Sequence, residues 1–221
     1  MTQAEQLLAI KAFVAHMFEH EQTGHDLPHL QRVVLLAQKI VLTEPTADQF
    51  IVEASAWLHD TYDDKLVANQ LIAKQRVGAF LTTIKVPLAQ QKVIFAIIDN
   101  MSWSKMLTQQ AKSLDINGKI VQDADRLDAI GAIGIARTIM YGVKHNTPLY
   151  DQTIRPRQEI DKQTYRQTTN TTIINHFDEK LLKIKDHLNT QYAQQVGQAR
   201  HQVMLTYLAA FKQEWQLAGL E

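Results

Sequence analysis

The stretch IVEASAWLHD, residues 51–60, ends an almost wholly apolar segment with two ionisable side chains, His59 and Asp60. Buried ionisable groups are costly unless they are paired or bind a metal. Neighbouring residues on a helix point about 100° apart, so both could reach one ion only near the inward edge of the helix. The stretch therefore predicts a buried helix over 47–59 that supplies part of a metal site, with further ligands from elsewhere.

The composition limits the class of protein and the kind of site. The 221 residues are 45% hydrophobic, which is enough for a substantial core. Twenty-three basic and 23 acidic side chains cancel, so charge gives no reason to expect nucleic acid or an anionic membrane as partner. The apolar runs are too short to cross a bilayer, and the chain has no cysteine. We expect a cytoplasmic protein whose metal ligands are His, Asp or Glu.

Apolar residues recur at spacings of three and four over most of the chain. This spacing predicts helices over 3–19, 26–40, 47–59, 67–84, 88–99, 120–140, 173–188 and 192–217. Asn117 and Gly118 predict a turn, and residues 142–172 predict an irregular basic loop. Alternation typical of strands is almost absent, which favours a single all-α domain over 1–221 with C-terminal helices over 173–217.

Two further segments offer ligands. Asp26 is a plausible N-cap and Pro28 suits a first helical turn, which places His29 on the inward face of the next helix. Asp125 lies inside the apolar segment 120–140. Two imidazoles and two carboxylates leave open positions on an octahedral ion and suit Mn²⁺, Fe²⁺, Co²⁺, Ni²⁺ or Mg²⁺ better than a closed structural zinc site. An open position is what a metal-dependent hydrolase requires.

A histidine, then an adjacent His-Asp pair, then a distant Asp resembles the pattern of the HD-domain phosphohydrolase superfamily. The likeness covers most of the chain: GHDLPHLQRV at 24–33, WLHD at 57–60 with DDK at 63–65, QDADRLDAIGAIGIAR at 122–137 and HFDEKL at 176–181. These motifs are similar to the small stand-alone bacterial YpgQ/YedJ-like group. The resemblance implies an HD-domain, phosphodiesterase-like helical bundle, one divalent ion such as Mn²⁺, and hydrolysis of nucleoside triphosphates to monophosphate and pyrophosphate.

The resemblance also implies roles for individual residues. Its metal ligands correspond to His29, His59, Asp60 and Asp125. Related HD nucleotidases have a glutamate where this chain has Asp63, a candidate for general acid or base together with Asp128. The third motif contains Asp123 and Asp128 as rival ligands, and Asp128 also suits a second-shell or water-positioning role. HD-domain branches with two or three metals have extra histidines in the core, and this chain has no histidine between His59 and His145, which favours a mononuclear site.

Positive charge is expected opposite the metal to bind phosphates. Lys65 is the first candidate for this, because it is nearest in sequence to the ligands. Further candidates for substrate binding are Arg32, His25, Arg137, His176 and Lys180, with Arg155 and Arg157 of the basic loop as clamps. Structural ion pairs for Arg32, Arg137 and Lys180, a core position for His176 and a surface position for His25 are equally open readings. The positive charges of a loop are more often solvated than ligand-binding.

Three functions fit these residues. The first is a nucleoside triphosphate pyrophosphohydrolase acting through metal-activated water. A 5′-nucleotidase or cyclic-nucleotide phosphodiesterase of the same superfamily is the nearest alternative. A non-catalytic metal- or nucleotide-sensing module is the alternative of another class. The aromatic stripe of the last helix is expected to pack in the core, and any exposed remainder would suit a homodimer.

Overall fold

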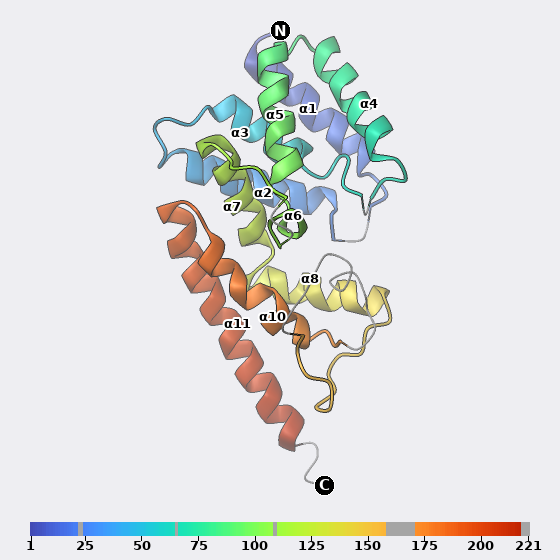
Figure 1. Ribbon diagram of the computed structural model, residues 1–221, viewed down its shortest axis with the longest axis vertical. Helices are drawn as coiled ribbons and strands as arrows, with labels where there is room; N and C mark the ends of the chain where they lie inside the picture. The colour runs from blue at the N-terminus through green and yellow to red at the C-terminus, as the bar shows by residue number, and fades with distance from the viewer. Residues whose placement is uncertain (22–23, 65, 108–109, 158–170, 218–221) are drawn as a thin grey trace. The chain divides into compact units, whose positions relative to one another are not determined.

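The computed structural model describes residues 1–21, 24–64, 66–107, 110–157 and 171–217 (Figure 1). Helices dominate these ranges and no strand occurs in them, which confirms the all-α prediction. The chain divides into two compact units, Met1–Asp125 and Arg126–Glu221, with the boundary inside helix α7 (Ile116–Asp128). The single domain expected over 1–221 stays a prediction.

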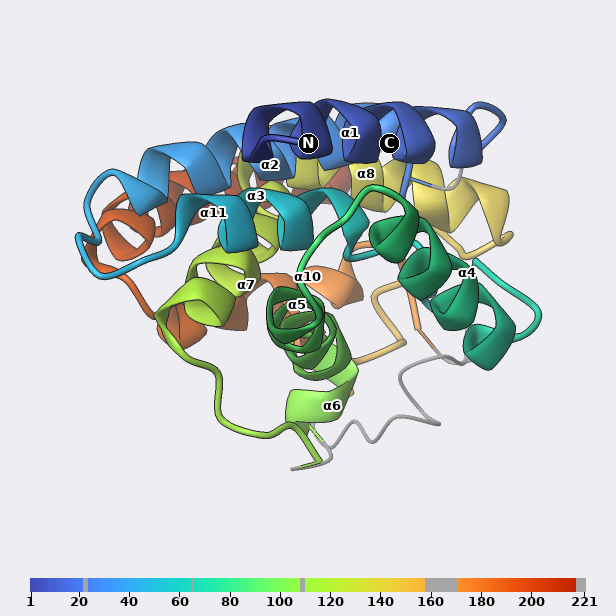
Figure 2. The same ribbon diagram turned by 90° about the horizontal axis from the view of Figure 1, so that it is seen from above.

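Helix α3 (Gln49–Leu58) lies at the centre of the first unit. It packs against α1 (Gln3–Met17), α2 (Leu27–Val41) and α5 (Leu88–Asn100), and α5 also contacts α4 (Gln70–Thr83) (Figures 1 and 2). Every α3 residue after Gln49 is buried. The nearly uninterrupted apolar pattern of α3 follows from this position, because the helix has neighbours on several sides.

Side-chain caps set the starting points of the helices that carry the site. The Asp26 carboxylate accepts a hydrogen bond of 2.9 Å from the His29 backbone N–H, and Pro28 stands in the same first turn. Asp48 caps α3 in the same way by accepting from the Ile51 N–H at 3.1 Å. These caps fix where α2 and α3 begin and therefore which of their residues face inward.

The second unit consists of α8 (Gly131–Lys144), α10 (Asn175–Glu179), the 3₁₀ helix η1 (Leu181–His187) and the long helix α11 (Gln191–Leu217). Within this unit α11 packs against α8 and η1, and α10 adjoins η1 (Figure 1). Among the described residues, no helix of either unit combines the length and apolarity needed to cross a bilayer.

The prediction of one continuous helix over 120–140 is wrong. The structure has two helices there, α7 and α8, separated at Ala129 and Ile130. Gly131 has a φ of +79°, a conformation that only glycine adopts readily, and Ile130 before it is extended. A Cβ on Gly134 would overlap the backbone carbonyl of Ala129. The two glycines therefore allow the break between the helices that apolar spacing alone could not reveal.

Three smaller expectations also differ from the structure. Asn117 and Gly118 lie in the first turn of α7, where Asp115 caps the helix by accepting from the Gly118 N–H at 2.9 Å. The helix expected over 173–188 is the short α10 followed by η1. Residues 142–144, expected in the irregular loop, belong to α8. Residues 145–157 are irregular, with turns at 145–146 and 152–153, and 158–170 lie outside the described residues. The short α6 (Trp103–Leu107) was not predicted.

Candidate metal centre

His29 stands in the first turn of α2 with its side chain almost completely buried. The Asp26 cap holds its backbone, so the imidazole projects from a fixed point on the inward face of the helix. This is the position that the apolar spacing of α2 predicts.

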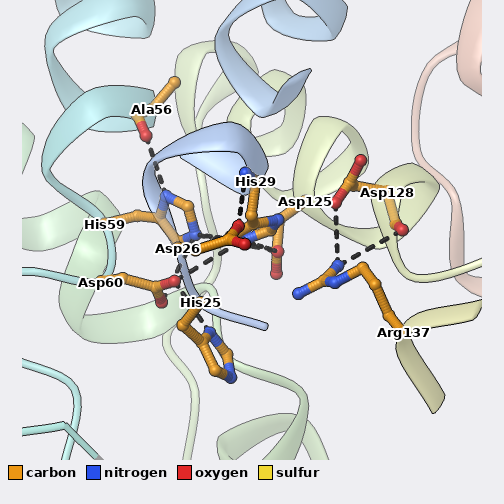
Figure 3. Close-up of polar contacts among 9 residues, drawn as sticks. All are labelled: His25, Asp26, His29, Ala56, His59, Asp60, Asp125, Asp128 and Arg137. Carbon is orange, nitrogen blue, oxygen red and sulfur yellow. Dashed lines mark hydrogen bonds and ion pairs between the residues drawn. The ribbon is translucent and has the colours of Figure 1, made fainter. Parts of the chain in front are cut away.

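His59 is the C-cap residue of α3, and Asp60 follows in the turn that leaves the helix. The Thr61 N–H and hydroxyl both donate to the Leu58 carbonyl, at 3.0 and 2.6 Å, and tighten this turn. His59 keeps helical backbone angles, with a φ of −59° and a ψ of −33°, although the helix ends at Leu58. Both side chains approach the same point (Figure 3).

Donor atoms of four side chains gather at that point from α2, the end of α3 and α7. His29 Nε2 lies 3.3 Å from His59 Nε2, 3.5 Å from Asp60 Oδ2 and 3.6 Å from Asp125 Oδ1. His59 Nε2 lies 3.4 Å from Asp60 Oδ1 and 3.8 Å from Asp125 Oδ1 (Figure 3). The structure thus brings together all four side chains that the sequence proposes as ligands.

The spacing of these atoms fits a divalent transition-metal ion. Ligands about 2.1 Å from an ion are separated by about 3.0 Å at octahedral angles and about 3.4 Å at tetrahedral angles. The observed separations of 3.3–3.8 Å are close to this range. Two imidazole nitrogens and carboxylate oxygens form a donor set for Mn²⁺, Fe²⁺, Co²⁺ or Ni²⁺. The residues present therefore fit a divalent ion.

The contact of the second ring nitrogen of His59, Nδ1, indicates which tautomer the imidazole adopts. His59 Nδ1 lies 2.8 Å from the Ala56 carbonyl oxygen, which can only accept a hydrogen bond. Nδ1 therefore carries a proton, and in the neutral imidazole Nε2 keeps a lone pair that faces the cluster. A backbone carbonyl behind a ligating histidine is a common arrangement at metal sites, because it fixes both tautomer and ring orientation.

Asp60 remains a carboxylate in this buried position. Burial by itself would raise its pKa, but the positive potential of His59 and His25 and the hydrogen bonds from His25 and His29 hold the pKa well below its usual value. His25 contributes through Nδ1, 2.8 Å from Asp60 Oδ2, and its side chain is 24% exposed. Two overlapping groups of side chains lie close enough to share an ion: His29 with His59 and Asp125, and His25 with His29 and Asp60.

The other aspartates predicted for the site are distributed differently. In the described part of the chain, the groups close enough to share an ion include Asp125 and neither Asp123 nor Asp128. Asp128 is buried in the second unit, where Arg137 donates to its Oδ2 at 2.8 Å and to its backbone carbonyl at 3.3 Å (Figure 3). Asp63 is half-buried, and its N–H donates to the Asp60 carbonyl at 3.2 Å.

The predicted phosphate-binding residues occupy several elements. Arg32 is half-buried on α2, one turn after His29, and Lys65 lies outside the described residues. His176 on α10 and Lys180 after it are half-buried parts of the second unit, and Arg155 is exposed there.

Arg157 has a structural partner rather than the open position expected of a phosphate clamp. Its Nε and Nη2 donate to the Glu179 carboxylate at 3.0 and 2.6 Å, and its backbone N–H donates to the same carboxylate at 3.0 Å. Thr171 adds a hydroxyl hydrogen bond to Glu179 at 3.1 Å. The buried Glu179 thus binds residues on both sides of 158–170, a role that no sequence pattern indicated.

Sequence reasoning also missed a polar cluster beside the metal ligands. Tyr62 donates from its hydroxyl to Asp99 Oδ1 at 3.1 Å, and Lys74 reaches Asp99 Oδ2 at 2.5 Å. These residues come from the turn after α3, from α5 and from α4. Nothing in their local sequence indicates that they meet, because their contacts depend on how the helices pack.

Comparison with known proteins gives a consistent result, although no protein-family model matches the chain. YpgQ of Bacillus subtilis is 35% identical over 97% of this chain and 94% of its own length. The crystal structure of YpgQ in complex with ADP aligns over 97% of both chains with a TM-score of 0.76 and 34% identity.

Two other crystal structures are similar over almost the whole chain. A protein of Lactobacillus plantarum is 40% identical, with a TM-score of 0.86 over 96% of this chain and 98% of that one. An HD-superfamily hydrolase of Bacillus thuringiensis is 35% identical, with a TM-score of 0.75 over 97% of this chain and 99% of that one. The protein therefore belongs to the HD superfamily of metal-dependent phosphohydrolases, in its YpgQ-like group.

Proposed function

We propose that this protein is a nucleoside triphosphate pyrophosphohydrolase that uses one divalent ion. The preferred ion is Mn²⁺, and its ligands are His29, His59, Asp60 and Asp125. The observation that carries the proposal is the convergence of these four side chains, whose donor atoms are linked by distances of 3.3–3.8 Å from His29 Nε2 or His59 Nε2. The ADP bound to the similar YpgQ structure supports a nucleotide as the substrate class. Mg²⁺, Co²⁺, Ni²⁺ and Fe²⁺ are the alternatives that the donor set also accommodates.

A divalent ion at this site supplies Lewis acidity and makes water a stronger nucleophile at neutral pH. The protein's contribution is to present the donors in fixed orientations. The Ala56 carbonyl holds the tautomer of His59, and His25 holds the carboxylate of Asp60. Such outer contacts reduce the reorganisation that binding and reaction would otherwise require.

The proposed reaction is attack of a water oxygen on the α-phosphorus. The bond from the α-phosphorus to the α–β bridging oxygen breaks, and the products are nucleoside monophosphate and pyrophosphate. The proton released from water passes to Asp63, which directly follows the ligand pair in the turn. Asp128 is the second candidate for this role, but its carboxylate already forms an ion pair with Arg137.

Cationic side chains would bind the phosphates. Arg32 is the first candidate for phosphate binding, because it lies on α2 one turn from His29 and is half-buried. His25 is partly exposed beside Asp60 and could contact substrate with its other ring nitrogen. The family motifs support further candidates for phosphate binding, which are Lys65 and, in the second unit, Arg137, His176 and Lys180.

The test is an assay of the purified protein with Mn²⁺ and a panel of nucleoside tri-, di- and monophosphates and cyclic nucleotides. We expect pyrophosphate and monophosphate from triphosphates, measured by separate detection of pyrophosphate and phosphate. Addition of a chelator should abolish the reaction, and Mn²⁺ should restore it.

Other product patterns would select the alternative functions. Phosphate released from monophosphates would indicate a 5′-nucleotidase, and opening of cyclic nucleotides would indicate a phosphodiesterase. Turnover of no member of the panel, combined with tight binding of Mn²⁺ or nucleotide, would contradict the catalytic proposal and favour a sensing module.

A further inference from the structure

Tyr62 is fixed at both ends although it lies in a turn. Its side chain is buried, and its hydroxyl donates to Asp99 Oδ1 at 3.1 Å. Its backbone carbonyl accepts from Gln70 Nε2 at 3.0 Å. The first contact joins the turn to the last part of α5, and the second joins it to the start of α4. Tyr62 is only two residues from Asp60.

Asp99 is in turn held by two lysines. Lys74 on α4 contacts Asp99 Oδ2 at 2.5 Å, and its ammonium lies 5.6 Å from the centre of the Tyr62 ring. Lys105 on α6 donates to the backbone carbonyl of Asp99. Lys74 and Asp99 are both 35% exposed, and an ion pair this exposed contributes little to stability on its own. The more specific consequence of this ion pair is to orient the Asp99 carboxylate, which accepts the hydrogen bond from the Tyr62 hydroxyl.

The local hydrogen bonds of the turn cannot position it within the unit. The Thr61 bonds to Leu58 and the Asp63 bond to Asp60 close short loops inside the segment. Tyr62 instead connects the segment to two other helices. A shift of Tyr62 would move the backbone of His59 and Asp60, because they belong to the same consecutive turns.

We propose that Tyr62, oriented by Asp99, is a positioning residue that holds His59 and Asp60 in metal-binding geometry. The inference rests on the proposed metal centre and adds to it two residues outside the four proposed ligands. The Tyr62 hydroxyl is buried and bonded to Asp99, so it acts through the backbone of the turn. Contacts that orient metal ligands commonly change metal affinity about 10–100-fold when removed.

The test is the affinity for Mn²⁺, measured by calorimetric titration of the full chain. Tyr62→Phe removes one oxygen and keeps the ring, while Asp99 keeps Lys74 as a partner. We expect the Kd for Mn²⁺ to rise about 10-fold while the protein remains folded. Tyr207→Phe is the matched control, because Tyr207 packs against Phe177 and Phe211 in the second unit. That variant should bind Mn²⁺ like the wild type.

Variants at Asp99 separate positioning from general stabilisation. Asp99→Ala removes the acceptor and should raise the Kd as much as Tyr62→Phe, and the double variant should bind no more weakly than either single variant. Asp99→Asn retains an acceptor oxygen for the hydroxyl and should recover most of the affinity.

Two results would overturn the proposal and can be told apart. Wild-type affinity in a folded Tyr62→Phe variant would reject the positioning role and leave the metal centre intact. Failure of the wild-type protein itself to bind Mn²⁺ would reject the metal centre and the positioning role together.

Discussion

The imidazoles of His29 and His59 face each other through their Nε2 atoms at 3.3 Å. The Ala56 carbonyl requires the proton of neutral His59 to be on Nδ1, so the Nε2 lone pair points at His29. Two ring nitrogens this close require a proton or a cation between them. The carboxylates of Asp60 and Asp125 border the same point and add negative potential, which favours a cation.

Asp63 provides the clearest test of the proton chemistry. Asp63→Asn removes a proton acceptor but preserves shape and size. We expect kcat to fall about 100-fold, with KM and Mn²⁺ affinity nearly unchanged, because a general base contributes mainly to the chemical step.

The neighbouring Asp64→Asn variant is the control for this experiment, since Asp64 is exposed in the same turn. Steady-state kinetics at saturating Mn²⁺ measure both variants. A wild-type kcat in Asp63→Asn would move the role to Asp128 or to another group.

Single residues were predictable where their position depends on local pattern. The Asp26 cap and helical spacing correctly place His29 on the inward face of α2. The contacts of His59 with Ala56 and of His25 with Asp60 depend on the exact conformation at a helix end and in a loop. Tyr62 and Asp99 are 37 residues apart, and only the packing of α5 brings them together.

At the scale of elements, the break between α7 and α8 depends on two glycines. Gly131 adopts a positive φ, and Gly134 leaves space for the Ala129 carbonyl. Apolar residues continue at helical spacing through the break, so the pattern alone predicts one helix. The backbone conformation at Gly131 is the physical reason for the difference.

The glycines allow a matched prediction. Gly134→Ala should destabilise the protein by about 1–3 kcal/mol, because a Cβ would overlap the Ala129 carbonyl. Gly78→Ala, inside α4, should stabilise it by about 0.5–1 kcal/mol, because a Cβ there would meet only the Phe95 ring at 3.7 Å.

Urea denaturation with a common slope measures both substitutions. Equal effects of the two substitutions on the unfolding midpoint would contradict the steric account of the break.

The predictions of helices α1 to α5 needed no such correction, since caps or proline breaks mark their starts in the sequence.

In the whole molecule, contacts between residues distant in sequence form the proposed metal centre. Such contacts also affect how the free energy of unfolding changes at low pH. In the second unit, burial alone would raise the pKa of Glu179, but hydrogen bonds from Arg157 and its charge lower it below the ordinary value of 4.5. A carboxyl group whose pKa is lower in the folded state contributes stability above its unfolded pKa. That contribution is lost as the pH falls through the folded pKa.

Glu179→Gln should therefore lower the free energy of unfolding at pH 7 by about 2 kcal/mol, because Arg157 would lose its charged partner. Its stability should also fall less steeply than that of the wild type below pH 4.5, which is the ordinary pKa of the group. Urea unfolding over a pH series measures both effects. Glu19→Gln, with a side chain 63% exposed, is the control; matching pH profiles for wild type and Glu179→Gln would contradict the assigned ion pair.

In the proposed metal centre, each chain holds one divalent ion through His29, His59, Asp60 and Asp125. Calorimetric titration with Mn²⁺ tests it most directly, with Asp125→Ala beside the control Asp186→Ala, whose side chain is 66% exposed. We predict one ion per wild-type and Asp186→Ala chain, and a loss of affinity of more than about 100-fold in Asp125→Ala. Full Mn²⁺ binding by Asp125→Ala, or no binding by the wild type, would contradict the account.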